Sequence, residues 1–365
     1  MILYGWGSNT YGQLGLGYKS DCEYEPKQID LSKTDIKAEN IVCIAGGATH
    51  TLILDSNGVV YCCGHNSKGQ LGLREEQLEF ANVDVLNSFR ITRISCGWDY
   101  STAISECGKI FVWGSNEYGQ LGLSYNLTCT SIPSRLYVPH TFFKDVSCGL
   151  GHSAMITHDG QLLVAGDGND GQLGLGHSFD QREYLGTSGV SKVYFMENIV
   201  SVATGQYHTV LLRKDGKVLT CGDNKHGQLG IDCASLCNVF TPIEVFHNEN
   251  LEKVYAGWTH SAALSKNGEI FIWGGNNYGQ LGSPRHQQYK PDKIPNLTDV
   301  VHLSLGLVHN VAVTKNGCLL TWGWNDIGSC GITEGSVIME PTKILSNHRV
   351  KLAFACYNSA FAVVE

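Results

Sequence analysis

Several features that would point to other classes of protein are scarce in this chain of 365 residues. Proline occurs only 8 times, and charged residues make up 16% of the composition. Proline-rich or highly charged tracts are typical of linkers and disordered segments, so we expect an ordered chain. No apolar run approaches the roughly 20 residues of a membrane span, and residues 1–9 lack the pattern of a signal peptide. We therefore expect no membrane insertion and a cytoplasmic protein with possible access to the nucleus.

Basic residues are also few. Lys and Arg number 26 against 34 Asp and Glu, which gives a net charge of −8, and the basic residues are scattered singly. A protein that binds nucleic acid through its phosphates usually carries a basic patch or tail. The composition therefore argues against direct binding of nucleic acid.

Glycine, in contrast, is abundant at 43 residues, and much of it belongs to one repeated tetrapeptide. Gly-Gln-Leu-Gly recurs in a repeat of roughly 52 residues, the kind of period that marks a repeat architecture. Its copies begin at Gly12, Gly69, Gly119, Gly171, Gly227 and Gly279, and a degraded seventh copy begins at Gly328. Seven units fill residues 1–365, so we expect a single domain.

Every unit has the same internal order. An apolar strand ends in Trp-Gly or a substitute, the Gly-Gln-Leu-Gly turn follows, and an outer strand comes next, often begun by proline. An alternating strand then leads into Gly-x-x-His-Ser/Thr, as in residues 257–261, and a hairpin such as Asn267-Gly268 leads to the next unit. Asn-Gly and Asp-Gly favour two-residue hairpins in which both central residues have positive φ. Four antiparallel strands per unit, seven times over, predict an all-β, seven-bladed β-propeller.

The two ends of the chain complete each other. The last unit stops after residues 357–364, where its hairpin and Trp-Gly strand should follow, and the chain begins with the matching strand, Ile2 to Trp6. We therefore expect the N-terminal strand to pair with the C-terminal strands and close the ring. Closure would remove sheet edges that otherwise invite aggregation.

The 14 cysteines fit the repeat rather than a metal site. Cys63 and Cys221 stand where other units have Trp, and Cys96 and Cys148 precede a repeated Gly. Neither close pair, residues 62–63 or 233 and 237, has partners at zinc-binding spacing. We interpret these residues as small apolar fillers and expect neither metal nor cofactor.

The combination of Trp-Gly-x-Asn-x-x-Gly-Gln-Leu-Gly with Gly-x-x-His-Ser/Thr resembles the regulator of chromosome condensation repeat family over all seven units. Residues 95–100 and 256–260 are most similar to its cytosolic, secretion-regulating guanine nucleotide exchange factors. The founding member is an exchange factor for the GTPase Ran, docks on chromatin, and has a basic N-terminal tail and an inserted β-wedge. This chain begins directly in the first strand, and no connection is expected to form a wedge, so chromatin docking and full Ran exchange are in doubt.

The repeated histidines are a tempting site, because a ring of them could bind a metal or move protons. They are His50, His152, His208, His260 and His309, with Tyr100 and Asn358 in the other two units. Recurrence in nearly every unit favours a structural role, in which each one bonds a neighbouring loop as a buried polar group must. The repeat thus explains the histidines without catalysis.

In the family, the loop that carries this histidine lies on the face that meets the GTPase. The resemblance therefore implies partner contacts at Asp99, Glu117, Asp170 and Asp326, with Trp98 and Trp258 as aromatic anchors. The alternatives are that the acids lie in solvated turns and that the two Trp residues pack between blades.

The function that these features favour is a protein-interaction propeller, expected to be monomeric, that regulates a small GTPase or a component of the secretion or exocyst machinery. Guanine nucleotide exchange is one form of that function and would need no side-chain catalysis. The alternatives are a chromatin-associated Ran-type exchange factor and an enzyme with a site in the central channel.

Overall fold

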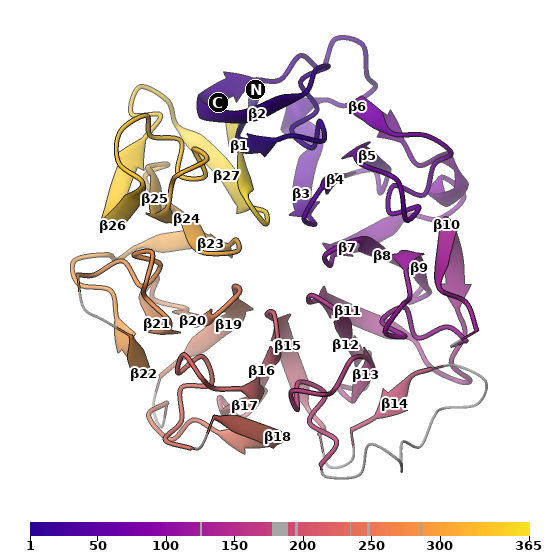
Figure 1. The fold of residues 1–365 in the computed structure, drawn as a ribbon, viewed down its shortest axis with the longest axis vertical. Helices are drawn as coiled ribbons and strands as arrows, with labels where there is room; N and C mark the ends of the chain where they lie inside the picture. The colour runs from indigo at the N-terminus through magenta and orange to yellow at the C-terminus, as the bar shows by residue number, and fades with distance from the viewer. Residues whose placement is uncertain (125, 177–188, 194–195, 234, 247–248, 285–286) are drawn as a thin grey trace.

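A computed structural model describes residues 1–365 apart from 125, 177–188, 194–195, 234, 247–248 and 285–286. Seven four-stranded antiparallel sheets are arranged as blades around a central axis (Figure 1). The predicted seven-bladed β-propeller is therefore confirmed. Short 3-10 helices, η1 (Ala38–Asn40) and η2 (Asp84–Leu86), lie in the connections that precede the first two inner strands.

The blades are numbered here from the inner strand β3, and each is given from the axis outward. Blade 1 contains β3 (Ile41–Gly46), β4 (His50–Asp55), β5 (Val60–Gly64) and β6 (Gln77–Asn82). Blade 2 contains β7 (Ile91–Cys96), β8 (Tyr100–Ser105), β9 (Ile110–Ser115) and β10 (Cys129–Leu136). Blade 3 contains β11 (Phe143–Cys148), β12 (His152–Thr157), β13 (Leu162–Gly166) and β14 (Ser191–Lys192). Blade 4 contains β15 (Ile199–Thr204), β16 (His208–Arg213), β17 (Val218–Asp223) and β18 (Leu236–Pro242).

The remaining blades follow the same order. Blade 5 contains β19 (Leu251–Ala256), β20 (His260–Ser265), β21 (Ile270–Gly274) and β22 (Gln288–Lys293). Blade 6 contains β23 (Val300–Leu305), β24 (His309–Thr314), β25 (Leu319–Trp324) and β26 (Val337–Ile344). Blade 7 contains β27 (Val350–Ala355), β28 (Ser359–Val364), β1 (Ile2–Asn9) and β2 (Ser20–Gln28).

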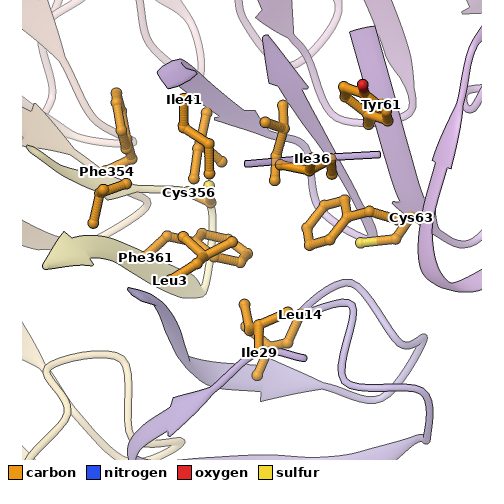
Figure 2. Packing of buried hydrophobic residues seen from close by; sticks show 14 residues of the cluster. Leu3, Leu14, Ile29, Ile36, Ile41, Tyr61, Cys63, Phe354, Cys356 and Phe361 are labelled. Carbon is orange, nitrogen blue, oxygen red and sulfur yellow. The ribbon is translucent and has the colours of Figure 1, made fainter. Parts of the chain in front are cut away.

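Blade 7 closes the ring as expected, with two strands from each end of the chain. β1 pairs with β28 from Ile2↔Val364 to Gly7↔Ser359, and β2 adds the outer strand. The adjacent core joins blade 7 to blade 1: Figure 2 shows Leu3 and Phe361 packed near Cys356 and Ile41. The termini therefore lie together in one blade, as Figure 1 shows.

The hairpin turns differ from the prediction. In Asp55-Ser56-Asn57-Gly58-Val59 only Gly58 has a positive φ, at 85°, and the N–H of Gly58 donates to the carbonyl of Asp55. This is a three-residue loop, a type I turn followed by a glycine bulge, rather than the two-residue hairpin expected. The equivalent glycines of the next five turns also have positive φ. Glycine is thus required at the bulge, whereas the residue before it keeps an ordinary conformation.

Prolines were expected to begin the outer strands, and that expectation is wrong. Pro133 lies inside β10, between the residues where the pairing with β9 shifts register, and Pro242 is the last residue of β18. Because these strands are at the outer edge of each blade, a missing N–H at an irregular position leaves no paired acceptor unsatisfied.

Candidate interaction face

One face of the ring carries both repeated motifs. In blade 1, His50 pairs with Gly64, so the Gly-x-x-His loop and the turn that begins at Gly69 emerge at the same end of the blade. Tyr100 pairs with Gly114 in blade 2 in the same way. We call this end the loop face and the end with the glycine-bulge hairpins the hairpin face.

The glycine of each Gly-x-x-His loop makes room for the aromatic ring three residues later. A Cβ built on Gly257 would overlap the imidazole of His260, and one on Gly97 would overlap the ring of Tyr100. Substitution there would force the ring or the neighbouring backbone to move. Blade 7 shows the converse: Cys356 occupies the glycine position, and the small Ser359 occupies the histidine position.

The strand pairing places Ser359, and not Asn358, at the histidine position of blade 7. Ser359 pairs with Gly7 as His50 pairs with Gly64 and Tyr100 with Gly114. The prediction that Asn358 holds the histidine position is therefore wrong by one residue. It failed because the last unit lacks both the glycine and the ring that define the motif.

The histidines connect neighbouring blades. His50 Nε2 lies 2.8 Å from Ser101 Oγ, and Ser101 Oγ donates to the backbone carbonyl of Gln70 at 2.8 Å. Since that hydroxyl proton is engaged, we infer that the imidazole donates from Nε2 and is neutral. The same contact joins three further pairs, His152–Thr209, His208–Ser261 and His260–Asn310. We call this arrangement the histidine latch.

Burial keeps the latch histidines neutral. It lowers the pKa of His50, His152 and His208 to about 3 and that of His260 to about 4, although the amide of Asn310 acts in the opposite direction on His260. The structural interpretation of these residues is supported by their bonds to the next blade. The same carbonyl of Gln70 also accepts from the indole of Trp113 at 2.8 Å. Cys63 and Cys221 replace that indole with a thiol directed to the carbonyl of Gln13 or Gln172.

Trp98 and Trp258 meet over the axis. Their ring centroids are 5.6 Å apart although they belong to blades 2 and 5, which lie on opposite sides of the ring in Figure 1. Tyr357 of blade 7 completes the cluster, with centroids 5.5 Å from Trp98 and 6.2 Å from Trp258. We call these three residues the aromatic cluster. Trp98 remains 39% exposed, so a partner can reach it.

Sequence reasoning missed Tyr357. Its position in the repeat could have revealed it: Tyr357 follows Cys356, which stands at the glycine position of blade 7, as Trp98 follows Gly97 in blade 2. Backbone bonds tie the loops together around this cluster: the N–H of Trp258 donates to Leu307, and the N–H of Leu307 donates to Tyr357, each at 2.8 Å.

Two of the predicted acids lie together. Asp99 and Glu117 both belong to blade 2, and Glu117 forms an exposed ion pair with Lys68. Burial and the charge of Glu117 raise the pKa of Asp99, while Ser115 and Lys68 act against that rise. Asp99, next to Trp98 in the chain, and Glu117 therefore bring two carboxylates to blade 2 of the loop face, and Lys68 pairs with one of them.

The other two acids lie on separate blades of the same face. Burial, with the charges of Asp223 and Asp167, raises the pKa of Asp170, and Lys225 opposes this shift. Asp326 is exposed, accepts a bond from the indole of Trp324 at 3.2 Å, and has its backbone carbonyl bonded by Tyr24. The structure thus brings Trp98 into contact with Trp258 and places Glu117 within electrostatic reach of Asp99. Glu117, Asp170 and Asp326 belong to the turns of three different blades.

The loop face also carries tyrosines that sequence reasoning overlooked. They occupy the position immediately before a Gly-Gln-Leu-Gly turn, and their exposed fractions are 38%, 55% and 45%: Tyr11, Tyr118 and Tyr278. The signal was present in the repeat, because this position differs between units while the glycine that follows it does not.

No group of three or more His, Cys, Asp or Glu able to hold a metal occurs among the residues that the structure describes. The histidines of the latch lie in different blades, and each one contacts a side chain of the next blade.

No helix within the described ranges is long and apolar enough to cross a membrane. The connection between Gly174 and β14 is longer than its counterparts in the other blades. The prediction that no connection forms a wedge concerns this segment too, and its residues 177–188 lie outside the described residues.

Comparison with known proteins agrees with this geometry. A model of the RCC1-like domain matches residues 2–362. The secretion-regulating guanine nucleotide exchange factor of Bos taurus is 34% identical over 77% of this chain and 61% of its own length, and that of Mus musculus is 33% identical over the same shares. The chain thus spans about three fifths of these relatives. The ultraviolet-B receptor of Arabidopsis thaliana is 32% identical over 84% of this chain and 69% of its own.

Solved structures show the same fold. Prp20p of Saccharomyces cerevisiae, described with binding properties to Gsp1p and histones, has a TM-score of 0.88 and 22% identity, and covers 99% of this chain and 90% of its own. Human WBSCR16 has a TM-score of 0.86 and 24% identity over the whole of both chains.

Proposed function

Because the chain belongs to the RCC1-like domain family, we propose that it is a protein-interaction propeller whose loop face binds and regulates a small GTPase or a component of the secretory machinery. The observation that carries this proposal is the aromatic cluster at the centre of the loop face, where Trp98 is 39% exposed and Asp99 follows it in the chain. Aromatic residues surrounded by polar groups are typical of interface hot spots.

The finer form of the proposal is guanine nucleotide exchange, which the relatives named as exchange factors support. Exchange requires a surface that displaces magnesium and nucleotide from the GTPase, and needs no catalytic side chain. Acidic residues such as Asp99 and Glu117 are suited to compete for the lysine and magnesium that hold a bound phosphate. Placement in the cytoplasm, and in the nucleus, is part of this proposal.

Affinity capture tests the interaction. Immobilised chain is incubated with purified small GTPases in the GDP, GTPγS and nucleotide-free forms, and retained GTPase is quantified. We expect retention to be strongest for the nucleotide-free form, as for an exchange factor. Equal retention of all three forms would support binding of the GTPase but argue against exchange activity. No retention of any GTPase would contradict the proposal.

Exchange itself is measured by the release of fluorescent GDP. The double variant Trp98→Ala/Glu117→Gln alters two side chains of blade 2 on the loop face, and we expect at least a tenfold lower release rate. Phe142→Ala is the matched control, because Phe142 is 58% exposed on the hairpin face beside Gly108. A rate that falls equally in both variants would point to a general loss of structure.

A further inference from the structure

The central channel contains a cavity of about 640 Å³ whose wall is formed by the innermost strand of every blade. These strands are β3, β7, β11, β15, β19, β23 and β27, which surround the opening in Figure 1. Small-molecule sites usually have volumes of about 300–1,000 Å³. The cavity is therefore large enough for a compact organic molecule.

The aromatic cluster crosses the channel at the loop face. Trp258 and Tyr357 line the cavity, and Trp98 contacts both of them. At the other end, Val42 and Glu252 are exposed parts of the lining. The cavity thus has an aromatic floor and a mouth on the hairpin face, so a ligand could occupy it while a protein covers the loop face.

Part of the wall is aromatic. His302 and Phe354 pack edge to face with centroids 5.0 Å apart, and Tyr255 lies on the neighbouring blade. Burial and the charge of Lys253 lower the pKa of His302 to about 4, so its ring is neutral near pH 7. Tyr255 and His302 are half-buried and offer flat, weakly polar surface to a ligand, whereas Phe354 is buried behind His302.

One cation in the cavity makes no direct ion pair with a carboxylate of the described residues. Arg93 faces Asp145 at 4.0 Å, whereas the ammonium of Lys253 lies 5.2 Å from the ring centroid of Tyr255 and forms no ion pair with any described residue. Burial raises the pKa of Asp145, and Lys253 and Arg93 oppose that rise. Lys253 attracts Asp145 without a direct ion pair, so its N–H donors are available to an anion.

The remaining charges limit the kind of anion. Asp145 and the exposed Glu252 lie in the same lining as Lys253 and Arg93, so two negative charges already offset the two positive ones. A polyphosphate would meet repulsion from both carboxylates, whereas a single carboxylate or sulfonate could bond to Lys253 alone.

We propose that the central channel binds a small organic monoanion with a flat apolar body. Its acid group would pair with Lys253, and its body would pack on Tyr255 and the indole of Trp258. Direct charge pairing in a partly desolvated site strengthens such a contact, and the aromatic surface supplies the rest.

The probe is 8-anilinonaphthalene-1-sulfonate, which carries one sulfonate on an aromatic body and fluoresces when bound. We expect saturable binding to the wild-type chain and at least tenfold weaker binding to Lys253→Met. Lys351→Met is the matched control, because Lys351 belongs to the inner strand β27 but its ammonium donates to the carbonyl of Glu39 at 3.2 Å. Thermal melts of both variants confirm that they fold.

Competition separates the two parts of the proposal. Benzoate, a monoanion with an aromatic ring, should displace the probe, and inorganic phosphate at the same concentration should not. Unchanged binding in Lys253→Met, equal loss in Lys351→Met, or displacement by phosphate as readily as by benzoate would each overturn the proposal.

Discussion

At the scale of single residues, the molecule depends on neutral histidines buried between blades. The latch histidines and His309 have pKa values near 3 or 4 against an ordinary value of 6.5, because burial penalises the charged ring. Above pH 6.5 both the folded and the unfolded chain hold them neutral, and their contribution to stability is complete. Below that pH the unfolded chain takes up protons that the folded chain cannot, so stability falls.

We therefore expect the free energy of unfolding to decrease from pH 7 to pH 5. Each fully buried histidine can contribute up to about 1.4 kcal/mol per pH unit below 6.5. Denaturant titrations at pH 7, 6 and 5 measure the slope. His260→Gln keeps a donor for Asn310 without a titrating ring. The unfolding free energy of this variant should therefore depend less steeply on pH, by an amount equal to the uptake of about one proton on unfolding. A stability that does not change over this range would contradict the neutral latch.

The pairing of glycine and ring makes a second residue-scale prediction. Gly257→Ala should destabilise the chain by about 1–3 kcal/mol, the usual cost of forcing extra atoms into a packed site. In a His260→Ser background, which copies the Cys356 and Ser359 pair of blade 7, the same substitution should cost less, and the remaining cost comes from the Gly306 carbonyl oxygen, 2.8 Å from the added Cβ. A double-mutant cycle measured by denaturant unfolding gives the coupling, and additive effects would refute the steric explanation.

At the scale of the element, the seven joints between blades are not equivalent. At the joint between blades 6 and 7, Ala360 stands at the position where four other joints have a hydroxyl or amide that bonds the latch histidine. In the degraded turn of the same joint, Ser329 replaces glutamine. Trp6 still donates to the carbonyl of Ser329 at 3.0 Å. His309, the histidine of this joint, therefore lacks the side-chain partner that the other latch histidines have, and neither of its ring nitrogens forms a hydrogen bond among the described residues.

Ala360→Ser should repair this joint. The added hydroxyl would lie between His309 and the carbonyl of Ser329, as Ser101 lies between His50 and Gln70, and we expect about 0.5–1.5 kcal/mol of stabilisation. Ser101→Ala is the converse control and should destabilise the chain by about 1–3 kcal/mol, since it leaves buried groups unpaired. Thermal unfolding measures both, and a lower melting temperature for Ala360→Ser would contradict the latch.

The repeat explains how much of these elements could be predicted. Strand order, ring closure and the Cys63 replacement of Trp could be predicted, because the motifs recur in the same order in every unit. The hairpin type did not, because Asn-Gly fits both a two-residue and a three-residue loop. Tyr357 and the unpaired Lys253 also escaped prediction, because their neighbours come from other blades and depend on the curvature of the ring.

At the scale of the whole molecule, closure ties distant parts of the chain into one cooperative unit. Deletion of residues 1–7 removes most of β1 and the buried Trp6, and exposes the edge of β28. We expect a loss of stability beyond the about 3–5 kcal/mol of a single buried Trp truncation. Thermal melting of the truncated chain measures this, and melting like that of the full chain would refute closure by β1.

A circular permutant provides the control for that truncation. Joining Glu365 to Met1 by a short linker and opening the chain at Asn267-Gly268 keeps every strand, and the ends already lie in one blade. The permutant should therefore fold with a melting temperature close to that of the original chain, which separates the loss of a strand from the mere relocation of an end.

The central claim is that the loop face binds a small GTPase, and direct binding measurements test it best. Wild-type chain, Trp98→Ala/Glu117→Gln and Phe142→Ala are titrated by interferometry against a panel of purified nucleotide-free GTPases of the Ran and Rab types. We expect submicromolar binding of at least one GTPase to the wild-type chain and to Phe142→Ala, and at least tenfold weaker binding to the loop-face variant. Binding that is unaffected by the loop-face substitutions, or no binding to any GTPase, would contradict it.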